Sequence, residues 1–165
     1  MSRVFYRFRR IVAAALGVLV ALPAIAGQIS SADDFDLDSY AGEVVYLDFW
    51  ASWCAPCKAS FPWMDSMQQR YADAGLHVLA VNVDAEPEAA ERFLATFVPE
   101  FDVVMDPDGV LASRYKIETM PSSFLIGRNG ELISSHKGFR DSDREKMEIG
   151  IQQALSRVQV TELMQ

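Results

Sequence analysis

The feature that most constrains this chain is a pair of cysteines, Cys54 and Cys57, at the junction between an apolar run and a helical pattern. The apolar run, Val44 to Trp50, has the length and composition of a buried strand, and a helix is expected from Ala55 onward. The N-terminus of a helix carries unpaired N–H groups and the positive end of the dipole, which stabilise a thiolate at Cys54. Cys57 follows one turn later and can resolve a mixed disulfide. The spacing therefore predicts a redox-active dithiol.

The spacing of the two cysteines also argues against a structural crosslink. They are the only cysteines in the sequence, and two residues separate them. A disulfide that closes so small a loop restrains little of the entropy of the unfolded chain. Pro56, between them, removes an N–H that the first helical turn leaves unpaired anyway, and it makes that turn more rigid. Such a pair is better suited to reversible oxidation than to holding the fold together.

The first 26 residues have the three parts of a secretory signal peptide. Residues 1–10 carry four arginines and no acid, residues 11–22 are apolar, and Ala24-x-Ala26 is a small-residue cleavage pattern. We therefore expect residues 1–26 to be cleaved during export to the periplasm, which leaves one domain at residues 27–165. The alternative is a retained anchor facing the periplasm, although the apolar run is shorter than the roughly 20 residues of a bilayer span.

Charge and ligand count argue against two kinds of partner. Removal of four arginines leaves 15 − 4 = 11 basic against 23 acidic residues, a net charge of 11 − 23 = −12. So acidic a protein is not expected to bind nucleic acid or anionic lipid. One C-x-x-C supplies two ligands where zinc usually takes four, and His77 and His136 are expected to be isolated, exposed strand residues. Neither a metal nor another cofactor is therefore expected.

The rest of the chain alternates between strand and helix patterns. Strands are expected at residues 44–50, 76–83, 101–105, 122–126 and 131–137, and helices at 55–74, 88–97, 110–115 and 141–158. Residues 28–34 are expected to form a loose lead-in, Phe35–Leu37 an edge strand, and residues 159–165 a frayed tail. Crossovers followed by a hairpin with Asn-Gly at its tip predict an α/β fold with a mixed sheet flanked by helices.

The segment around the cysteines resembles a known family. Residues 47–62, L-D-F-W-A-S-W-C-A-P-C-K-x-x-F-P, are similar to the active site of the thioredoxin superfamily, and in particular to its periplasmic thiol-disulfide reductases of the TlpA/ResA type. The resemblance extends over about residues 35–155 and implies a thioredoxin fold, with residues 88–105 as the TlpA/ResA-type central insertion. It also implies that Trp53 covers the disulfide and that Trp53 and Pro56 contact substrate.

Two further positions match the superfamily. Met120-Pro121, in T-M-P-S-S-F-L-I, resembles the segment whose cis proline lies against the active-site disulfide and binds the substrate backbone; the alternative is an ordinary trans proline at a strand start. Asp48 matches the buried aspartate of thioredoxin, which relays a proton to or from the resolving cysteine. A lone carboxylate in such an apolar run should have a raised pKa. The alternative for Asp48 is a side chain that points to solvent.

The resemblance implies a monomeric periplasmic reductase of client protein thiols, with apocytochrome c among the candidates, recharged by a membrane donor of the DsbD/CcdA type. Ser60 departs from the pattern, because several ResA-like reductases carry a glutamate there. One alternative is an oxidant of the DsbA type, although those proteins usually have histidine where Pro56 stands. Another is a non-enzymatic chaperone or binding module on the same fold. A thiol peroxidase is disfavoured, because Ala51 replaces the threonine of peroxiredoxin-type sites.

Overall fold

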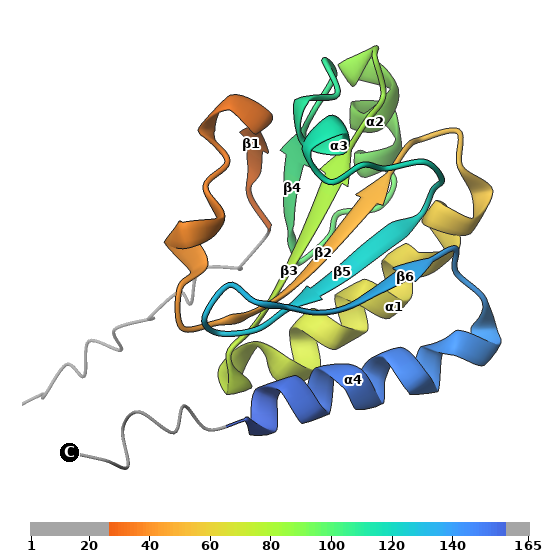
Figure 1. Ribbon diagram of the computed structural model, residues 1–165. Helices are drawn as coiled ribbons and strands as arrows, with labels where there is room; N and C mark the ends of the chain where they lie inside the picture. The colour runs from red at the N-terminus through yellow and green to blue at the C-terminus, as the bar shows by residue number, and fades with distance from the viewer. Residues whose placement is uncertain (1–26, 158–165) are drawn as a thin grey trace, which may run out of the picture.

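A six-stranded mixed sheet lies at the centre of the protein, in the order β1-β4-β3-β2-β5-β6 (Figure 1). The computed structural model describes residues 27–157. The strands are β1 Ile29–Ser31, β2 Val44–Trp50, β3 Leu76–Asn82, β4 Asp102–Met105, β5 Ser122–Ile126 and β6 Leu132–Lys137. The first four are parallel to one another, whereas β5 is antiparallel to both β2 and β6. The α/β thioredoxin fold expected from the sequence is thus confirmed.

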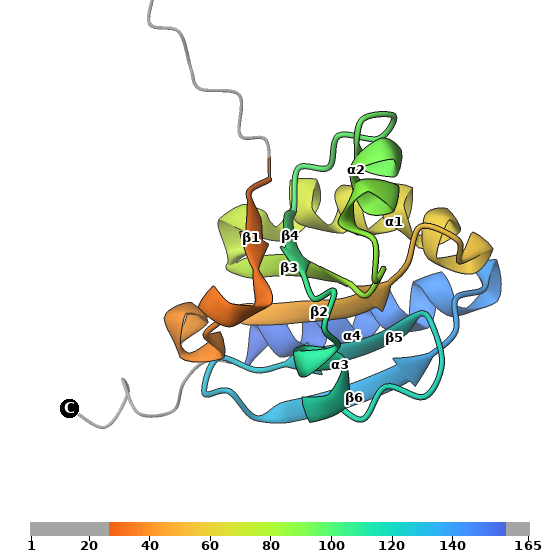
Figure 2. The ribbon, with the colours of Figure 1, turned by 90° about the horizontal axis from the view of Figure 1, so that it is seen from above.

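Helices cover both faces of this sheet. The α-helices are α1 Ala55–Tyr71, α2 Pro87–Leu94, α3 Val110–Arg114 and α4 Arg144–Ser156, and the 3₁₀ turns are η1 Ala32–Asp34, η2 Leu37–Tyr40, η3 Ala72–Ala74 and η4 Asp141–Asp143. Buried residues of α1, α2 and α4 form one core cluster with the sheet, and Leu111 of α3 belongs to a second cluster. Seen from above, β1 lies at one edge of the sheet and β6 at the other (Figure 2).

All seven residues of strand β2 are buried, because β2 lies between β3 and β5 and is covered on both faces. Successive side chains of a strand point to opposite faces, and here Tyr46 and Trp50 enter the first cluster while Leu47 and Phe49 enter the second. A strand buried on both faces has no polar alternation, which is why the sequence shows an almost unbroken apolar run. Asp48 is the one charged residue in that run, and β2 carries it into the interior.

The insertion expected at residues 88–105 corresponds to α2 and β4. Aromatic rings attach it to the helix that carries the cysteines. The ring of Phe61 in α1 lies 4.6 Å from that of Trp50, 4.9 Å from Phe93 and 5.3 Å from Phe101, measured between centroids. All three are edge-to-face contacts, a geometry that adds about 0.5–1.5 kcal/mol per pair beyond area burial. The insertion therefore supports the start of the active-site helix.

The N-terminal edge of the sheet differs from the expectation. The prediction of an edge strand at Phe35–Leu37 is wrong, because the Asp36 side chain accepts a hydrogen bond from the Asp38 N–H, 3.0 Å, and turns the chain into η2. The edge strand is instead β1, inside the segment expected to be loose. Asp102 Oδ1 accepts the Gln28 N–H at 2.7 Å and so fixes the start of β1 beside β4.

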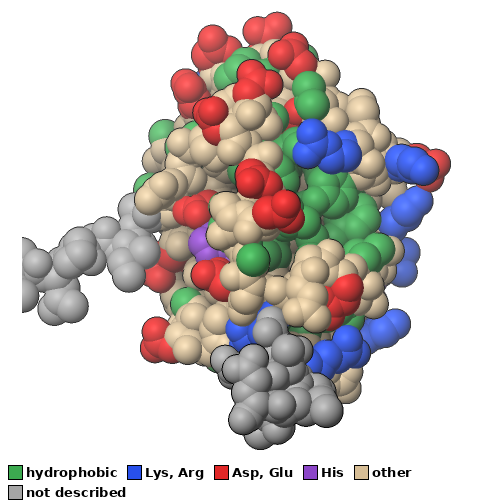
Figure 3. Space-filling model, turned by 60° about the vertical axis from the view of Figure 1, so that its left-hand side comes forward, with side chains coloured by type: hydrophobic (Ala, Val, Ile, Leu, Met, Phe, Trp, Pro, Cys, Tyr) green, Lys and Arg blue, Asp and Glu red, His purple; other side chains and the backbone are tan. Residues whose placement is uncertain are grey.

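The other boundaries agree with the sequence to within a few residues. The last helix ends at Ser156 rather than at residue 158, and α2 ends at Leu94 rather than at residue 97. The expected signal peptide and frayed tail lie outside the described residues. From residue 27 to residue 157, none of the helices combines the length and the apolar character needed to cross a bilayer. Acidic side chains are spread over much of the surface in Figure 3, with Lys and Arg along one side.

Candidate active site

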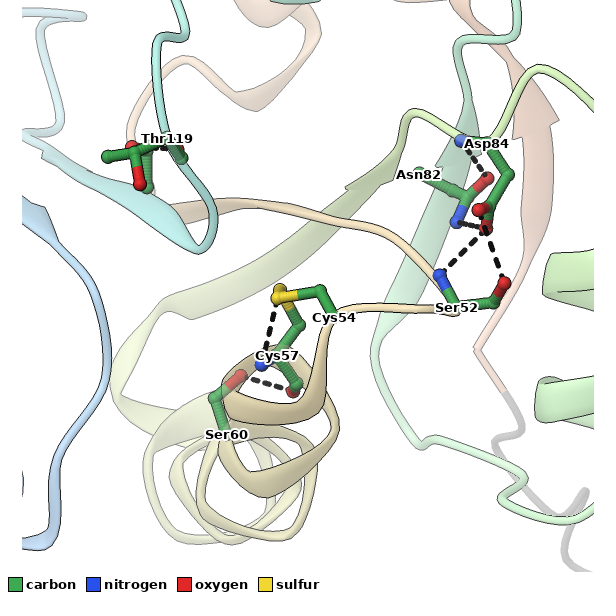
Figure 4. The surroundings of a disulfide bond; sticks show 8 residues. Ser52, Cys54, Cys57, Ser60, Asn82, Asp84 and Thr119 are labelled. Atoms are coloured by element: carbon green, nitrogen blue, oxygen red, sulfur yellow. Dashed lines mark hydrogen bonds between the residues drawn. A yellow bond between two sulfur atoms is a disulfide. The ribbon is translucent and has the colours of Figure 1, made fainter.

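A disulfide between Cys54 and Cys57 stands at the start of α1 (Figure 4). The S–S distance is 2.01 Å and the two Cα atoms are 5.3 Å apart. Cys54 is the N-cap residue of α1, and its Sγ accepts a hydrogen bond from the Cys57 N–H at 3.3 Å. The N-cap is the position where the unpaired N–H groups of the first turn converge. The same N–H would therefore stabilise a thiolate on Cys54 after reduction.

The two sulfur-bearing residues differ in their access to solvent. Cys57 is fully buried, whereas Cys54 keeps 5% of its surface exposed. Trp53, directly before it, is 70% exposed, and Pro56 is exposed as well. An incoming disulfide can therefore reach Cys54 but not Cys57. Trp53 and Pro56 thus present exposed side chains directly beside Cys54 and between the two cysteines.

The loop before Cys54 is held by Asp84, a buried residue that the sequence reasoning missed. Asp84 Oδ2 accepts the Ser52 N–H at 2.8 Å and Asn82 Nδ2–H at 2.8 Å, and its Oδ1 accepts the Ser52 hydroxyl at 3.2 Å (Figure 4). Asp84 is 4% exposed. The available signal was the polar pair Asn82 and Asp84 at the carboxyl end of β3, the edge where parallel strands commonly build sites. The network fixes the turn between β2 and the disulfide.

The peptide bond between Met120 and Pro121 is cis, as the resemblance implied. Pro121 is buried, and the half-buried Met120 packs against the core cluster that contains both cysteines. The Ser122 hydroxyl donates to the Thr119 carbonyl oxygen at 2.7 Å and holds the turn before β5. The structure thus brings the Met120–Pro121 segment and the C-x-x-C to the same cluster.

Asp48 is buried in the sheet below the cysteines and is 2% exposed, so the alternative of a solvent-facing side chain is wrong. Burial raises the pKa of its carboxyl well above the ordinary value, as expected. Its Oδ2 has no hydrogen-bond partner among residues 27–157. It shares a face of β2 with Tyr46 and Trp50, which belong to the same cluster as Cys57. A carboxyl in this setting is a stronger base than an exposed one.

Ser60, at the position of the family glutamate, is buried on the first turns of α1, and its hydroxyl donates to the Cys57 carbonyl oxygen at 2.7 Å. It therefore serves the helix backbone and adds no charge near the sulfurs. Lys58 is exposed, with its Nζ 5.5 Å from the centre of the Phe93 ring. The only charge next to the C-x-x-C on α1 is thus directed toward the insertion.

The two histidines are not the exposed, isolated residues that the sequence suggested. His77 Nε2 lies 2.9 Å from Asp102 Oδ2 and its Nδ1 lies 3.3 Å from a Glu43 carboxylate oxygen. His136 Nε2 lies 3.3 Å from Asp143 Oδ2. Both side chains are partly buried. Their acidic partners were not foreseen because each lies on another segment of the chain, which sequence periodicity cannot place beside the histidine. Within the described part of the chain, no three His, Cys, Asp or Glu side chains gather as a metal site requires.

The fold and the site together define a thioredoxin-fold protein with a C-x-x-C disulfide at the start of its first long helix. The comparisons with known proteins agree with that class. The sequence profile of the Redoxin family matches residues 20–151, so the chain belongs to that family, as a TlpA/ResA-like member of the thioredoxin superfamily.

Relatives with assigned names point in the same direction. The thiol-disulfide oxidoreductase ResA of Bacillus thuringiensis is 30% identical over 113 residues, which cover 68% of this chain and 64% of ResA. The chain thus spans less than two thirds of that relative's length. A Chlorobium tepidum protein assigned as thiol:disulfide interchange protein DsbE is 50% identical, with a TM-score of 0.71 over 73% of this chain and 85% of the other. StoA of Bacillus subtilis is 29% identical, with a TM-score of 0.58 over 67% and 83% of the two chains.

Proposed function

We propose that this protein is an exported thiol-disulfide oxidoreductase that reduces disulfides in client proteins. The observation that carries the proposal is the asymmetric dithiol site, a disulfide at a helix N-terminus in which Cys54 is accessible and Cys57 is buried. The same core holds the buried carboxyl of Asp48, whose Oδ2 has no hydrogen-bond partner among residues 27–157. The ResA and DsbE names of its relatives support the same chemistry.

In the first step, the Cys54 thiolate attacks one sulfur of a client disulfide. A mixed disulfide forms between Cys54 and the client, the client S–S bond breaks, and the leaving client sulfur takes the electron pair and then a proton. The helix N-terminus and the Cys57 N–H stabilise the attacking thiolate. Trp53, Pro56, Met120 and Pro121 contact the client, with the Met120 backbone pairing with an extended segment as in strand addition.

In the second step, Cys57 resolves the mixed disulfide. Its thiol gives a proton to the Asp48 carboxylate, and its sulfur attacks Cys54 Sγ, so the bond from Cys54 to the client breaks and the second client thiol leaves. The raised pKa of Asp48 makes its carboxylate a base of useful strength in an otherwise apolar site. Two electrons have then passed from the dithiol to the client, and the protein is left with the Cys54–Cys57 disulfide.

The sequence and the resemblance support a proposal for the cellular setting. The N-terminal pattern supports cleavage after Ala26 and release into the periplasm, with a retained anchor as the alternative. There the protein acts as a monomer on client thiols, apocytochrome c among them. It is reduced again by a membrane donor of the DsbD/CcdA type, because the oxidised form cannot repeat the reaction without two new electrons.

The direction of the reaction is tested by the reduction potential of the Cys54–Cys57 pair, measured by equilibration in dithiothreitol and glutathione buffers. A reductase is expected near thioredoxin, at about −270 mV or lower. A value nearer the roughly −120 mV of DsbA overturns the reductase proposal in favour of an oxidant of exported thiols.

Paired cysteine variants test the assigned roles and the non-enzymatic alternative. Cys57→Ser is expected to trap covalent complexes with clients, because the first step proceeds and the second cannot. Cys54→Ser is the matched control and should trap none, since Cys57 is buried. If cells that carry Cys54→Ser kept full function, the dithiol would be dispensable and a binding or chaperone role would be correct.

A further inference from the structure

Three polar residues lie side by side across the sheet, in a row that starts at the buried carboxyl. Ser123 of β5 is the direct cross-strand partner of Asp48 in β2, and His136 of β6 is the direct partner of Ser123. Directly opposite residues on neighbouring strands point to the same face, with their Cβ atoms about 4.5–5.5 Å apart. The three side chains therefore form one row on the face that α1 and α4 cover (Figure 1).

A pocket follows this row toward solvent. Its volume is about 140 Å³, and Tyr46, Ser123 and His136 line it together with Lys146 and Met147 of α4. One water molecule needs only about 10–15 Å³ of such space, so this pocket has room for several. Ser123 is 4% exposed, and His136 keeps 31% of its side chain exposed. The pocket therefore connects Ser123, the middle residue of the row, with His136 at its solvent-facing end, and Asp48 lies behind Ser123 as its cross-strand partner.

Asp48, at the inner end of the row, needs a path along which protons can reach solvent. Asp48 Oδ2 has no partner among residues 27–157, and the Tyr46 hydroxyl, two residues away on the same face, donates to Met147 Sδ at 3.7 Å. Burial is the largest cause of the raised Tyr46 pKa, with the Asp48 charge second and a hydrogen bond from Ser123 opposing both. Cys57 itself offers no direct route to water, since it is fully buried.

The outer end carries groups that can exchange protons with solvent. His136 Nε2 lies 3.3 Å from Asp143 Oδ2 without hydrogen-bond geometry, and the Asp143 side chain is 24% exposed. Lys146 is the other charged group on the pocket wall, and it is exposed. Imidazole is the side chain best suited to exchanging protons near neutral pH. The row thus runs from a buried base to a group of the right kind beside water.

We propose that Ser123 and His136 relay the proton of Asp48 between the interior of the sheet and solvent. The proton that Asp48 takes from the Cys57 thiol during resolution passes to the Ser123 oxygen as Ser123 gives its own proton to His136, directly or through pocket water. His136 then releases it to bulk water, and Asp48 is again a carboxylate. The relay rests on the proposed function, and it moves protons only, with no change in the electron balance of the exchange.

The test is single-turnover reduction of oxidised glutathione by the reduced full-length protein in weak buffer, with acid quenching and mass detection of the glutathionylated intermediate. Ser123→Val is expected to slow resolution roughly tenfold or more, near the low end of what positioned proton transfer contributes, so that the intermediate accumulates. Ser123→Thr introduces a side chain of the same shape as valine but keeps the hydroxyl, so this variant should resolve the mixed disulfide at the wild-type rate. His136→Ala should be slow in weak buffer and recover when imidazole is added.

Two controls separate a relay from a structural role. Ser134→Val changes a hydroxyl residue that lines the same pocket but pairs with Leu125 outside the row, and it should leave the rate unchanged. The reduction potential should be the same in every variant, because a relay changes rates and not the equilibrium. Equal slowing by Ser123→Thr and Ser123→Val, or a shifted potential without rescue by imidazole, overturns the relay.

The same experiment distinguishes failure of the relay from failure of the proposed function. If the wild-type dithiol does not reduce glutathione disulfide, the proposed function itself is wrong. If Asp48→Asn resolves as fast as the wild type, Asp48 is not the base and the relay has no proton to carry. If Asp48→Asn is slow while Ser123→Val and His136→Ala are fast, the dithiol mechanism stands and the relay alone is rejected.

Discussion

At the scale of single residues, Asp48 combines a cost in stability with the chemical role that we propose for it. It is buried in a strand whose other six residues are uncharged, and its Oδ2 has no partner in the described chain. Leaving a buried polar group unsatisfied costs about 1–3 kcal/mol. A reaction that must move one proton inside an apolar site gives a physical reason to keep it.

The cost of Asp48 has a definite dependence on pH. Its folded pKa lies above the ordinary value of 3.8, so as pH rises the unfolded state loses this proton first. The favourable contribution of the protonated carboxyl is therefore fully present below about pH 4 and is lost as pH rises through the folded pKa. Asp48→Asn does not titrate and should be more stable than the wild type at pH 7, by about 1–3 kcal/mol, with little difference at pH 3.

Urea unfolding of the oxidised protein at several pH values measures this difference. Asp33→Asn, a change of the same kind at an exposed position, is the control and should show no such trend. A constant difference between wild type and Asp48→Asn across the pH range would mean that Asp48 titrates alike in the folded and unfolded states.

At the scale of elements, the decisive junction is the turn from β2 into α1. The strand delivers the chain to the end of the sheet, and the helix begins at Cys54. Between them the backbone is fixed from a different element, since Asp84 after β3 accepts two hydrogen bonds from Ser52. The position of the disulfide therefore depends on the pairing of β2 with β3 as much as on the local sequence.

Asp84→Ala should accordingly weaken the junction. It leaves the Ser52 N–H and the Asn82 side-chain N–H without their acceptor, and each such loss costs about 1–3 kcal/mol, so a total destabilisation of about 2–6 kcal/mol is expected. Chemical denaturation measures the change, and hydrogen exchange at residues 51–54 should rise with it. Asp73→Ala, at an exposed position in η3, serves as the control. Unchanged exchange at the turn would show that the ends of β2 and α1 hold it unaided.

At the scale of the whole molecule, net charge distinguishes this protein from a neutral reductase. Without the four arginines of the expected signal peptide, the chain carries 15 − 4 = 11 basic and 23 acidic residues. On the face seen in Figure 3, acidic side chains are scattered over the top, left and centre, while most Lys and Arg lie along the right and the bottom. Such a surface attracts basic partners over distances set by the Debye length, about 8–10 Å at physiological salt.

Reduction of a disulfide-bonded peptide should therefore depend on the charge of that peptide. A peptide of net positive charge should be reduced faster than its neutral counterpart at low salt, by roughly tenfold, with the advantage lost near 0.5 M salt. Rates measured by fluorescence at several salt concentrations test this, with the neutral peptide as the control. An advantage that survives high salt would indicate recognition by contacts at the site rather than by the overall field.

The fold and the dithiol were predictable because their signals are local. The buried strand, the helix start and the Asn-Gly hairpin are written in consecutive residues, and the Met120–Pro121 motif is a short string. The edge strand was missed for a physical reason. Whether residues 29–31 or 35–37 pair with the sheet depends on Asp102, whose carboxylate fixes Gln28 from 74 residues away.

What the sequence by itself determined is the class of this protein: an α/β fold with a pair of redox-active cysteines at the N-terminus of a helix and an aspartate in the strand before that helix. The tertiary structure alone decided what surrounds those groups. The hydrogen bonds from Ser52 to Asp84 join segments that are far apart along the chain. The row from Asp48 through Ser123 to His136 does the same. Such contacts are set by the register between strands, and a shift of one residue would turn every side chain to the other face.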